Sequence, residues 1–495
     1  MEKQWFENME SKIPKGKVRT RFAPSPTGYM HVGGLRTALY AYLTAKQAGG
    51  TFILRIEDTD TARFVEGATD IIFKTLKGAG LNYDEGPDVG GPVAPYTQSE
   101  RKSIYRPYAE LLCEKGAAYY CFCDSDEKRE YEIKNDPCRD LSYDLSKKRV
   151  DAGDPFVVRM KAPREGETTV HDIVFGDVTT PNKTLDDMVL LKRDGLPTYN
   201  FANVIDDHLM GITHVMRGSE YISSAPKYNI LYKAFGWEIP AYITVSPVMR
   251  DEKNKLSKRQ GDPTYDDLLA EGYLPEAILN YVALLGWSPG GENEKFNLIE
   301  LVKEFNVSGI SKSPAIFDIN KLNYFNSEYI RALTPGEFAD IAKPYISSAI
   351  KNPNISIDEV AKILQARCEK LNDIPDKIDF FDNLPDYDTE LYIHKKSKTD
   401  KMISRDMLIS AKKALELQSD WTSEAIHDTL ITLALDLDVK NATLMWPVRI
   451  AAAGKAVTPG GAVELLYILG KEETLRRINT GLQKLNSNRG GTFDE

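Results

Sequence analysis

Hydrophobic positions in the first part of the chain alternate between two patterns, short apolar runs and helical spacing. Residues 17–22 and 51–56 carry short apolar runs typical of buried strands. Between them, Leu35, Leu39 and Leu43 recur along one face of a helix. The order strand, helix, strand predicts a parallel α/β sheet whose crossover helices cover its faces.

This alternation is interrupted over residues 116–195, where the chain becomes charged and irregular. Apolar runs at 156–161 and 168–174 predict strands inside the interruption, and strands return at 212–216 and 242–248. We therefore expect a Rossmann-like parallel-sheet domain that carries an inserted α+β domain.

From residue 331 to the end, helical segments separated by prolines replace the strand signal, which predicts an all-α region. The predicted division is an N-terminal extension (1–16), the first half of the sheet domain (17–115), the insert (116–195), the second half of the sheet domain (196–262), a helical segment (263–330) and the all-helical region (331–495).

The turn after the first strand carries the first chemical signal. Residues 21–36 read RFAPSPTGYMHVGGLR, in which two prolines end the strand. A helix that begins at Gly33 and Gly34 offers free N–H groups and a positive dipole end to an anion. His31 precedes it and is placed to donate to a phosphate oxygen. The motif predicts a nucleotide triphosphate site, although a plain turn with a packed histidine explains the same residues.

A second motif, KLSKR at residues 255–259, favours the first interpretation. APSPTGYMHVGG resembles the HIGH signature of class I aminoacyl-tRNA synthetases, and KLSKR resembles their KMSKS loop. The segments RIEDTD, YDEGPD, PTYNFANVIDDHLMG and FGW are similar to those of bacterial glutamyl-tRNA synthetases. The matching segments follow the family order from about residue 17 to about residue 325.

The resemblance implies ligation of glutamate to the 3′-terminal adenosine of tRNA(Glu) through a glutamyl-adenylate, with ATP and Mg²⁺. Some bacterial members also charge tRNA(Gln), and the sequence leaves this alternative open. The sheet domain would be catalytic, 116–195 would bind the tRNA acceptor end, 263–330 would contact its stem and 331–495 would bind the anticodon. Activation joins two anions, so positive charge is required near the phosphates.

The resemblance also implies the site residues, with His31 and Lys258 as the catalytic ones. Those implied for ATP are Ser25, Gly28, His31, Gly33, Gly34, Lys255, Ser257 and Lys258. Those implied for glutamate are Arg21, Ala23, Ser25, Glu57, Tyr199, Asn203, Arg217 and Glu220. We expect Arg21 to pair with the side-chain carboxylate, because the guanidinium fork matches it, and Glu57 to bind the ammonium group.

Three cysteines suggest a tentative structural zinc site. Cys121, Cys123 and Cys138 resemble a zinc site that some bacterial members carry in the insert, but Asp140 stands where those members have a histidine. Structural zinc prefers sulfur and nitrogen ligands. A zinc site and three unused cysteines therefore both stay open, and the missing histidine favours the unused cysteines.

Two further features carry weaker predictions. The triplet at 206–208, Asp-Asp-His, suggests a metal site, but neighbouring residues on a strand face opposite sides, so we expect it to shape a loop beside the ATP site. In the C-terminal region, Arg367 aligns with a family position implicated in reading the last anticodon base.

Composition narrows the kind of partner and of compartment. The net charge of −10 means that a tRNA-binding face must concentrate its positive charge. The N-terminus has no apolar signal region, and no run approaches the roughly 18 apolar residues that span a bilayer. The five cysteines do not suggest a disulfide framework. We expect a cytoplasmic monomer.

Four rival interpretations have their own tests. Glutaminyl-tRNA synthetases have Glu where Ser25 stands and a β-barrel C-terminal half, and the short paralogue that modifies a tRNA base lacks an anticodon domain. A nucleotidyltransferase of similar fold and a non-catalytic tRNA-binding protein are distinguished by ATP–pyrophosphate exchange with glutamate, with and without tRNA. Intact His31, Glu57 and Lys258 disfavour the non-catalytic protein.

Overall fold

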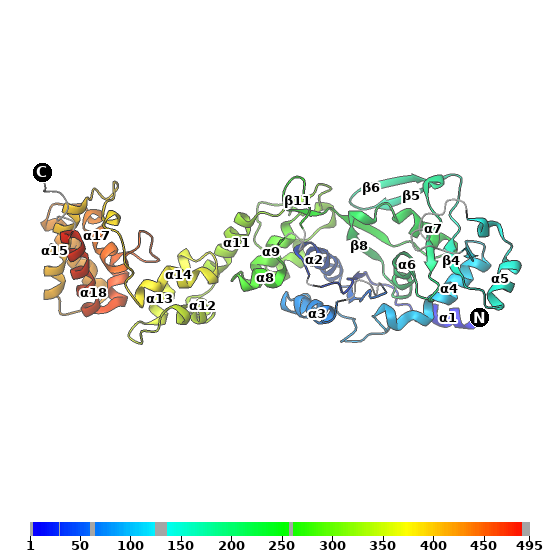
Figure 1. Cartoon of the computed structure of the whole chain (residues 1–495), viewed down its shortest axis with the longest axis horizontal. Helices are drawn as coiled ribbons and strands as arrows, with labels where there is room; N and C mark the ends of the chain where they lie inside the picture. The colour runs from blue at the N-terminus through cyan, green and yellow to red at the C-terminus, as the bar shows by residue number, and fades with distance from the viewer. Residues whose placement is uncertain (1–2, 29, 60–64, 124–135, 257–260, 488–495) are drawn as a thin grey trace. The chain divides into compact units, whose positions relative to one another are not determined.

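The chain forms two compact units, and each is described by itself (Figure 1). The computed structural model describes residues 3–28, 30–59, 65–123, 136–256 and 261–487. The first unit comprises 1–268 and 275–319, and the second comprises 269–274 and 320–495. The six-part division expected from the sequence is finer than these two units and stays a prediction. Within the described parts, no helix combines the length and the apolar character needed to cross a membrane.

A six-stranded sheet in the order β2-β1-β8-β9-β5-β6 forms the centre of the first unit. Its strands are β1 (Arg19–Phe22), β2 (Thr51–Leu54), β5 (Glu167–Asp172), β6 (Gly176–Pro181), β8 (His214–Gly218) and β9 (Ala241–Val245). All neighbouring strands run parallel except β5 and β6, which form an antiparallel hairpin at one edge. The predicted parallel α/β sheet is confirmed.

The direction of strand order reverses between β1 and β8. Helix α2 (Val32–Gln47) connects β1 to β2 on one side, and α7 (Ala225–Phe235) connects β8 to β9 on the other. Helix α6 (Tyr199–Leu209) precedes β8 in the chain. In open α/β sheets, ligands bind outside the carboxyl ends of the strands at such a reversal. The carboxyl ends of β1 and β8 are therefore the place to look for a site.

The strands of the predicted insert are divided between two sheets. Strands β3 (Ala118–Cys121), β4 (Val157–Met160) and β7 (Val189–Leu191) form an antiparallel sheet of their own. The β5–β6 hairpin instead extends the edge of the main sheet, where Asp172 pairs with Tyr242. Figure 1 shows this hairpin at the border of the unit. Hydrogen bonds therefore join part of the insert to the main sheet.

The remaining elements of the first unit surround these sheets. They are α1 (Lys3–Ser11), α3 (Ala68–Gly78), η2 (Gln98–Arg101), α4 (Lys102–Glu114), η3 (Pro137–Asp140), α5 (Tyr143–Asp151), η4 (Asn182–Thr184), η5 (Ser219–Tyr221), β10 (Val248–Met249), α9 (Pro275–Leu284), α10 (Leu298–Glu304), η7 (Val307–Gly309) and β11 (Ala315–Ile316), with α8 (Tyr265–Ala270) at the end of its first segment.

Helix α1 lies in the segment expected to be a polar extension, yet it packs on the body of the unit. The rings of Trp5 and Phe6 lie 5.8 and 5.1 Å from that of Tyr108, measured between centroids. The carboxylate of Glu10 lies 2.9 Å from Nε2 of His208, in the last turn of α6. One face of the extension therefore packs, partly buried, against the core of the unit.

The second unit is helical and has its own apolar core, which confirms the expected all-α region. Its helices are α11 (Ile319–Ala332), α12 (Pro335–Ala349), α13 (Ile357–Leu364), η8 (Gln365–Arg367), η9 (Leu371–Asp373), α14 (Ile374–Ile378), η10 (Asp379–Phe381), η11 (Thr389–Tyr392), α15 (Lys401–Leu417), α16 (Ser423–Asp436), α17 (Asn441–Ala453) and α18 (Ala462–Ser487). Helix α18 kinks at Gly470, whose φ of 77° suits a residue without a Cβ.

A buried arginine connects three segments of this unit. Arg477, on α18, is 1% exposed and donates from Nη1 to the carbonyl oxygens of Phe380 and Ala452, at 2.7 and 2.6 Å. Its Nε donates to Glu473 at 2.6 Å. The guanidinium therefore satisfies carbonyls at the end of η10 and of α17 that would otherwise lie in the core without a donor.

Arg477→Ala is expected to lower the free energy of unfolding of the second unit by about 3–5 kcal/mol, because it leaves buried acceptors without their donor. The matched control is Arg476→Ala. Arg476 binds the same Glu473 but is largely exposed, so its loss should cost about 0–1 kcal/mol. Urea unfolding followed by tryptophan fluorescence measures both. Equal losses would contradict the structural role of Arg477.

Candidate active site

Four charged side chains are buried together at the carboxyl ends of β1 and β2. Arg21, on β1, donates from Nε to Oδ1 of Asp207 at 2.9 Å. Arg55, directly after β2, donates from Nη1 to the same oxygen at 2.7 Å, and from Nη2 to Oε1 of Glu57 at 2.9 Å. None of the four is more than 4% exposed. Two guanidiniums thus share two carboxylates out of contact with bulk water.

Burial and charge act differently on the two carboxyl groups. Burial raises the pKa of Glu57 to about 7, although Arg55 and Arg21 oppose it. Burial acts in the same direction on Asp207, but there Arg21 and Arg55 outweigh it and hold the pKa below its ordinary value. Near pH 7, Asp207 is therefore ionised and Glu57 is only partly so, which leaves the network with a positive surplus.

A second group of buried side chains gathers around Asp206, the preceding residue on α6. It accepts from Nε of Arg101 at 2.7 Å, from the hydroxyl of Tyr105 at 2.9 Å and from Nε2 of Gln98 at 3.0 Å. The strand geometry expected for the acidic triplet is wrong, because the triplet lies within α6. Its two aspartates bind arginines in separate groups.

Arg217, on β8, is a buried cation for which the described residues supply no carboxylate partner. It is 7% exposed, and its guanidinium lies over the rings of Tyr228 and Tyr242, at 4.8 and 4.5 Å from their centroids. Aromatic faces stabilise the charge only partly. A desolvated cation in this position favours an anionic ligand.

Helix α6 adds two of the predicted glutamate residues to the same place. Asn203 donates from Nδ2 to the backbone carbonyl of Tyr199, one turn earlier, at 3.0 Å. Burial raises the pKa of Tyr199, and the nearby charges of Glu57 and Arg21 also act on it. The structure therefore brings together Arg21, Glu57 and Tyr199, three of the residues that we expect to bind glutamate.

The proline turn lies against this pocket. The N–H of Glu57 donates to the carbonyl of Pro24 at 3.0 Å, which places Ala23 and Ser25 on either side of that contact in the chain. Ser25 is exposed. Gly28 has a φ of 126°, which explains why the turn uses glycine there.

His31 caps helix α2 with its own side chain. Its Nδ1 accepts from the N–H of Gly33 at 3.0 Å, so the ring proton lies on Nε2 and is available to a ligand. A Cβ at Gly33 would lie 2.9 Å from Cε1 of the ring, and one at Gly34 would lie 3.3 Å from Met30. Glycine at the first of these positions therefore permits the cap.

Two residues of opposite charge shift the pKa of His31 in opposite directions. Desolvation of the ring lowers the pKa of the imidazole, the positive charge of Arg36 lowers it further, and the negative charge of Glu220 raises it. Arg36 is buried, donates from Nη1 to the carbonyl of Leu285 at 2.8 Å and also donates to that of Ser246. The predicted Glu220 thus faces the His31 side of the site.

The KLSKR segment begins beside the same helix start. Lys255 pairs with Met249, and the N–H of Leu256 donates to the carbonyl of Val248 at 3.0 Å. The side chain of Val248 lies 3.9 Å from the position that a Cβ on Gly33 would take. The backbone at Lys255 and the start of α2, which are far apart in the sequence, therefore lie near each other in the first unit.

The loop returns to the same corner at its other end. The backbone of Thr264 forms an antiparallel β-bridge with that of His31, and the N–H of Tyr265 donates to the carbonyl of Met30. Ser257 and Lys258, predicted for ATP and for catalysis, lie outside the described residues. Both ends of the loop that carries them are fixed beside His31.

The three predicted zinc cysteines gather with an aspartate. One potential ligand atom from each of Cys121, Cys123, Cys138 and Asp136 lies within 4.8 Å of all the others. Sγ of Cys123 is 3.8 Å from Sγ of Cys138 and 3.5 Å from Oδ1 of Asp136. The carboxylate in this group is thus Asp136, and Asp140 is exposed.

In the second unit, Arg367 lies at the centre of a small cationic and aromatic surface. It donates to the carbonyl of Thr458 at 2.7 Å, and Arg449 donates to the hydroxyl of the same residue at 2.8 Å. Arg449 also lies over the ring of Trp446, on which His394 stacks at 3.7 Å between centroids. The sequence had indicated only Arg367 in this group.

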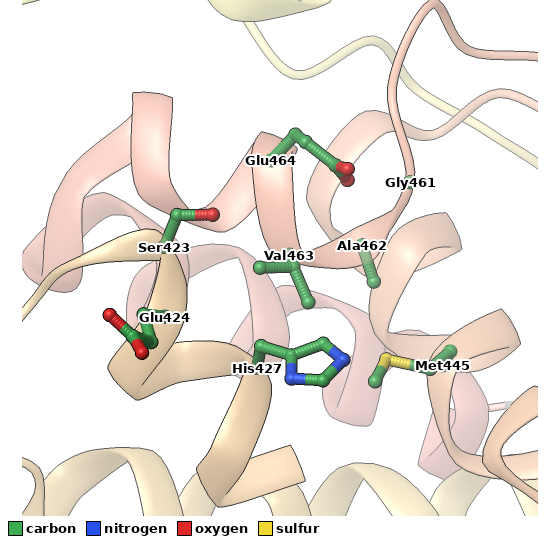
Figure 2. Close-up of a pocket in the computed structure, with 8 residues that line it drawn as sticks. All are labelled: Ser423, Glu424, His427, Met445, Gly461, Ala462, Val463 and Glu464. Atoms are coloured by element: carbon green, nitrogen blue, oxygen red, sulfur yellow. The ribbon is translucent and has the colours of Figure 1, made fainter. Parts of the chain in front are cut away.

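A groove of about 610 Å³ opens on the same unit (Figure 2). It is lined by Ser423, Glu424, His427, Met445, Gly461, Ala462, Val463 and Glu464. Figure 2 shows the imidazole of His427 directed toward Met445. Glu424 and Glu464 lie in the first turns of α16 and α18, where they complement the helix dipoles. The groove contains none of the predicted site residues.

Comparisons with known proteins show the family to which the chain belongs. Residues 17–324 match the family described as tRNA synthetases class I (E and Q), catalytic domain, and residues 337–482 match an anticodon binding domain. A glutamate–tRNA ligase from Clostridium botulinum is 55% identical over 480 residues, which cover 95% of this chain and 99% of the relative. One from Clostridium tetani is 53% identical over 479 residues, covering 95% and 98%.

A solved structure is similar as well. The crystal structure of a glutamate tRNA ligase from Elizabethkingia meningosepticum, in complex with its amino acid, has a TM-score of 0.85 and 34% identity, covering 95% of this chain and 100% of that one. The chain therefore belongs to the class I aminoacyl-tRNA synthetases of the E and Q type. Among these synthetases, it is a glutamate–tRNA ligase by its similarity to the two relatives named above.

His31 is expected to titrate below the ordinary histidine pKa of 6.5, so it is neutral and able to cap α2 at pH 7. Arg36→Met should raise the pKa of His31 toward 6.5, because a positive neighbour is removed. NMR of histidine-labelled protein measures this, with His31→Gln assigning the signal among the 6 histidines. As a control, Arg36→Met should leave the pKa of His214 unchanged, since burial alone lowers it. An unmoved His31 signal would contradict the electrostatic link.

Proposed function

We propose that the chain activates glutamate with ATP and transfers it to the 3′-terminal adenosine of tRNA(Glu), using the pocket at the carboxyl ends of β1 and β8 as its glutamate site. The observation that carries the proposal is the surplus of buried positive charge there. Arg21, Arg55 and Arg217 supply three buried cations, whereas Asp207 and Glu57 supply at most two negative charges. An acidic amino acid restores the balance.

The reaction needs positioning and charge but no protein nucleophile. The α-carboxylate of glutamate attacks the α-phosphate of ATP, pyrophosphate leaves, and a ribose hydroxyl of the tRNA then displaces AMP. The start of α2 and Nε2 of His31 support phosphate binding, and Lys255, whose backbone pairs with Met249, is assigned to join them. Lys258 is assigned to the departing pyrophosphate. Mg²⁺ is expected with ATP, held mainly by phosphate oxygens and water.

Arg217 and Arg21 divide the recognition of the substrate side chain. Arg21 is already anchored to Asp207 and the carbonyl of Met216, whereas Arg217 lies over two tyrosine rings and has no ion pair with a carboxylate among the residues that the structure describes. Arg217 therefore supplies the uncompensated charge, and Arg21 supplies an oriented donor. Glu57 takes the ammonium group when it is ionised. Glutamine would leave the charge of Arg217 without a counter-ion, and sites of this kind discriminate by roughly 10⁴.

Arg217→Met is expected to lower the preference for glutamate over glutamine, as the ratio of kcat/KM values, by about a hundredfold or more. ATP–pyrophosphate exchange in the presence of tRNA measures it. Arg106→Met, at an exposed arginine paired with Glu110, is the control and should leave the preference unchanged. If Arg217→Met kept full preference for glutamate, the pocket assignment would be wrong.

The surface around Arg367 is proposed as part of the anticodon contact. Arg367 and Arg449 provide cations for phosphates or base edges, and Trp446 provides an aromatic face. Single-stranded RNA loops are read through unstacked bases and such side chains. This proposal extends the anticodon-binding match, which covers all three residues.

A structural zinc ion is proposed for the insert, with Asp136 as its fourth ligand. In a tetrahedral site with Zn–S of about 2.3 Å and Zn–O of about 2.0 Å, two sulfurs lie about 3.8 Å apart and a sulfur and an oxygen about 3.5 Å apart. The distances from Cys123 to Cys138 and to Asp136 are 3.8 and 3.5 Å. Bound zinc would fix the fold of the insert. The free thiols it requires fit the reducing conditions of the cytoplasm.

Asp136→Asn is expected to reduce bound zinc well below one ion per chain, because an amide is a poor zinc ligand. The control is Asp140→Asn, which removes the carboxylate at the position of the family histidine and should leave zinc at about one per chain. Elemental analysis of protein purified without chelators gives both values. Loss of zinc in the Asp140 variant alone would show that the fourth ligand was assigned wrongly.

A further inference from the structure

The guanidinium of Arg21 is held in one orientation by two anchors. Its Nε donates to Oδ1 of Asp207 at 2.9 Å, and its Nη1 donates to the backbone carbonyl of Met216 at 3.1 Å. Its Nη2 has no hydrogen bond to any residue that the structure describes. A side chain with four rotatable bonds is thereby reduced to a single donor group aimed at the pocket.

Asp207 holds Arg55 with the same oxygen. Nη1 of Arg55 donates to Oδ1 at 2.7 Å, and the nitrogen on the other side of that guanidinium binds Glu57. Asp207 therefore connects the proposed side-chain site at Arg21 to the proposed ammonium site at Glu57. Its carboxylate also keeps two desolvated cations from repelling each other across the pocket.

The helix that carries Asp207 also forms a wall of the pocket. Tyr199, Asn203 and Asp207 are spaced four residues apart on α6, so they follow one face of the helix. Helix α6 thus places two pocket residues and the anchor of Arg21 as one rigid element. A displacement of Asp207 would turn Arg21 relative to the residues that contact the substrate.

We propose that Asp207 is a positioning residue for amino-acid selection. It sets the orientation of the Arg21 guanidinium and, through Arg55, the orientation of the Glu57 carboxylate. This inference rests on the proposed function of the pocket. Without the anchor, Arg21 loses its fixed donor, and Glu57 is left to neutralise both arginines. Glutamate binding weakens, and the advantage of a carboxylate over an amide in the same place falls.

Asp206 supplies a matched comparison on the same turn of α6. It is as deeply buried as Asp207 and pairs with an arginine at a similar distance, 2.7 Å from Nε of Arg101. Its partners Arg101 and Tyr105 lie in the other group of buried side chains, and its third partner, Gln98, also donates to Glu57 at 3.4 Å, but none of the three binds Arg21. Loss of its charge should damage stability as much as loss of Asp207, without releasing Arg21.

The experiment compares Asp207→Asn and Asp207→Glu with Asp206→Asn, in ATP–pyrophosphate exchange with tRNA present. The full-length chain is used, and its folding is checked by thermal unfolding. Both Asp207 variants are expected to raise KM for glutamate at least tenfold and to lower the preference for glutamate over glutamine at least tenfold. The KM for ATP should stay within twofold. Asp206→Asn should keep the preference within threefold, even where its melting temperature falls.

Asp207→Glu keeps the negative charge but moves the carboxylate by one methylene group, which displaces the anchor of Arg21, so it remains informative if Asp207→Asn does not fold. A folded Asp207→Glu enzyme with unchanged KM and preference would overturn the proposal. So would an equal loss of preference in Asp206→Asn, which would mean that any damage to the buried charges has this effect. If Arg217→Met also leaves the preference intact, the pocket assignment itself has failed. If Arg217→Met destroys it, only the positioning role has failed.

Discussion

Selection of an acidic amino acid requires arginines that are withdrawn from water, and a desolvated arginine is unstable without nearby negative charge. The first unit is organised around this constraint. Its strand order brings Arg21 and Arg217 to neighbouring strands, and the end of β2 delivers Arg55 and Glu57 beside them. Helix α6 then supplies Asp207. The balance is left incomplete, and that incompleteness is what makes the pocket suitable for an anion.

The phosphate side of the site follows a different principle. We propose that the start of α2 and Lys255 supply the positive potential there. His31 and Gly33 form a local cap whose geometry depends on three consecutive residues. The lysine loop begins near Gly33, where the side chain of Val248 lies, and its other end is joined to the cap by the β-bridge between Thr264 and His31. One half of the site is therefore rigid and buried, and the other is built from an exposed turn and a tethered loop.

The sequence predicted best what depends on neighbours along the chain. The strand, turn and helix around His31 follow from proline, glycine and apolar spacing, and the parallel sheet and the helical second unit were confirmed. Asp207 was expected on a loop or strand and lies in a helix. Nothing local indicates that it binds Arg21 and Arg55, which are 186 and 152 positions away. Asp136 was missed for a related reason, since a family spacing pointed to Asp140 and the chain path brings Asp136 to the cysteines.

The docking of α1 has a consequence for the order in which the chain can fold during synthesis. Glu10 and His208 are 198 positions apart, and the aromatic residues of α1 pack on Tyr108. A ribosome adding 5–20 residues per second needs roughly 10–40 s to reach the end of α6 after α1 has emerged. For the first part of that interval, until Tyr108 has been made, Trp5 and Phe6 lack the ring on which they pack. The contact of Glu10 with His208 can therefore form only after 198 further residues have been added to the chain.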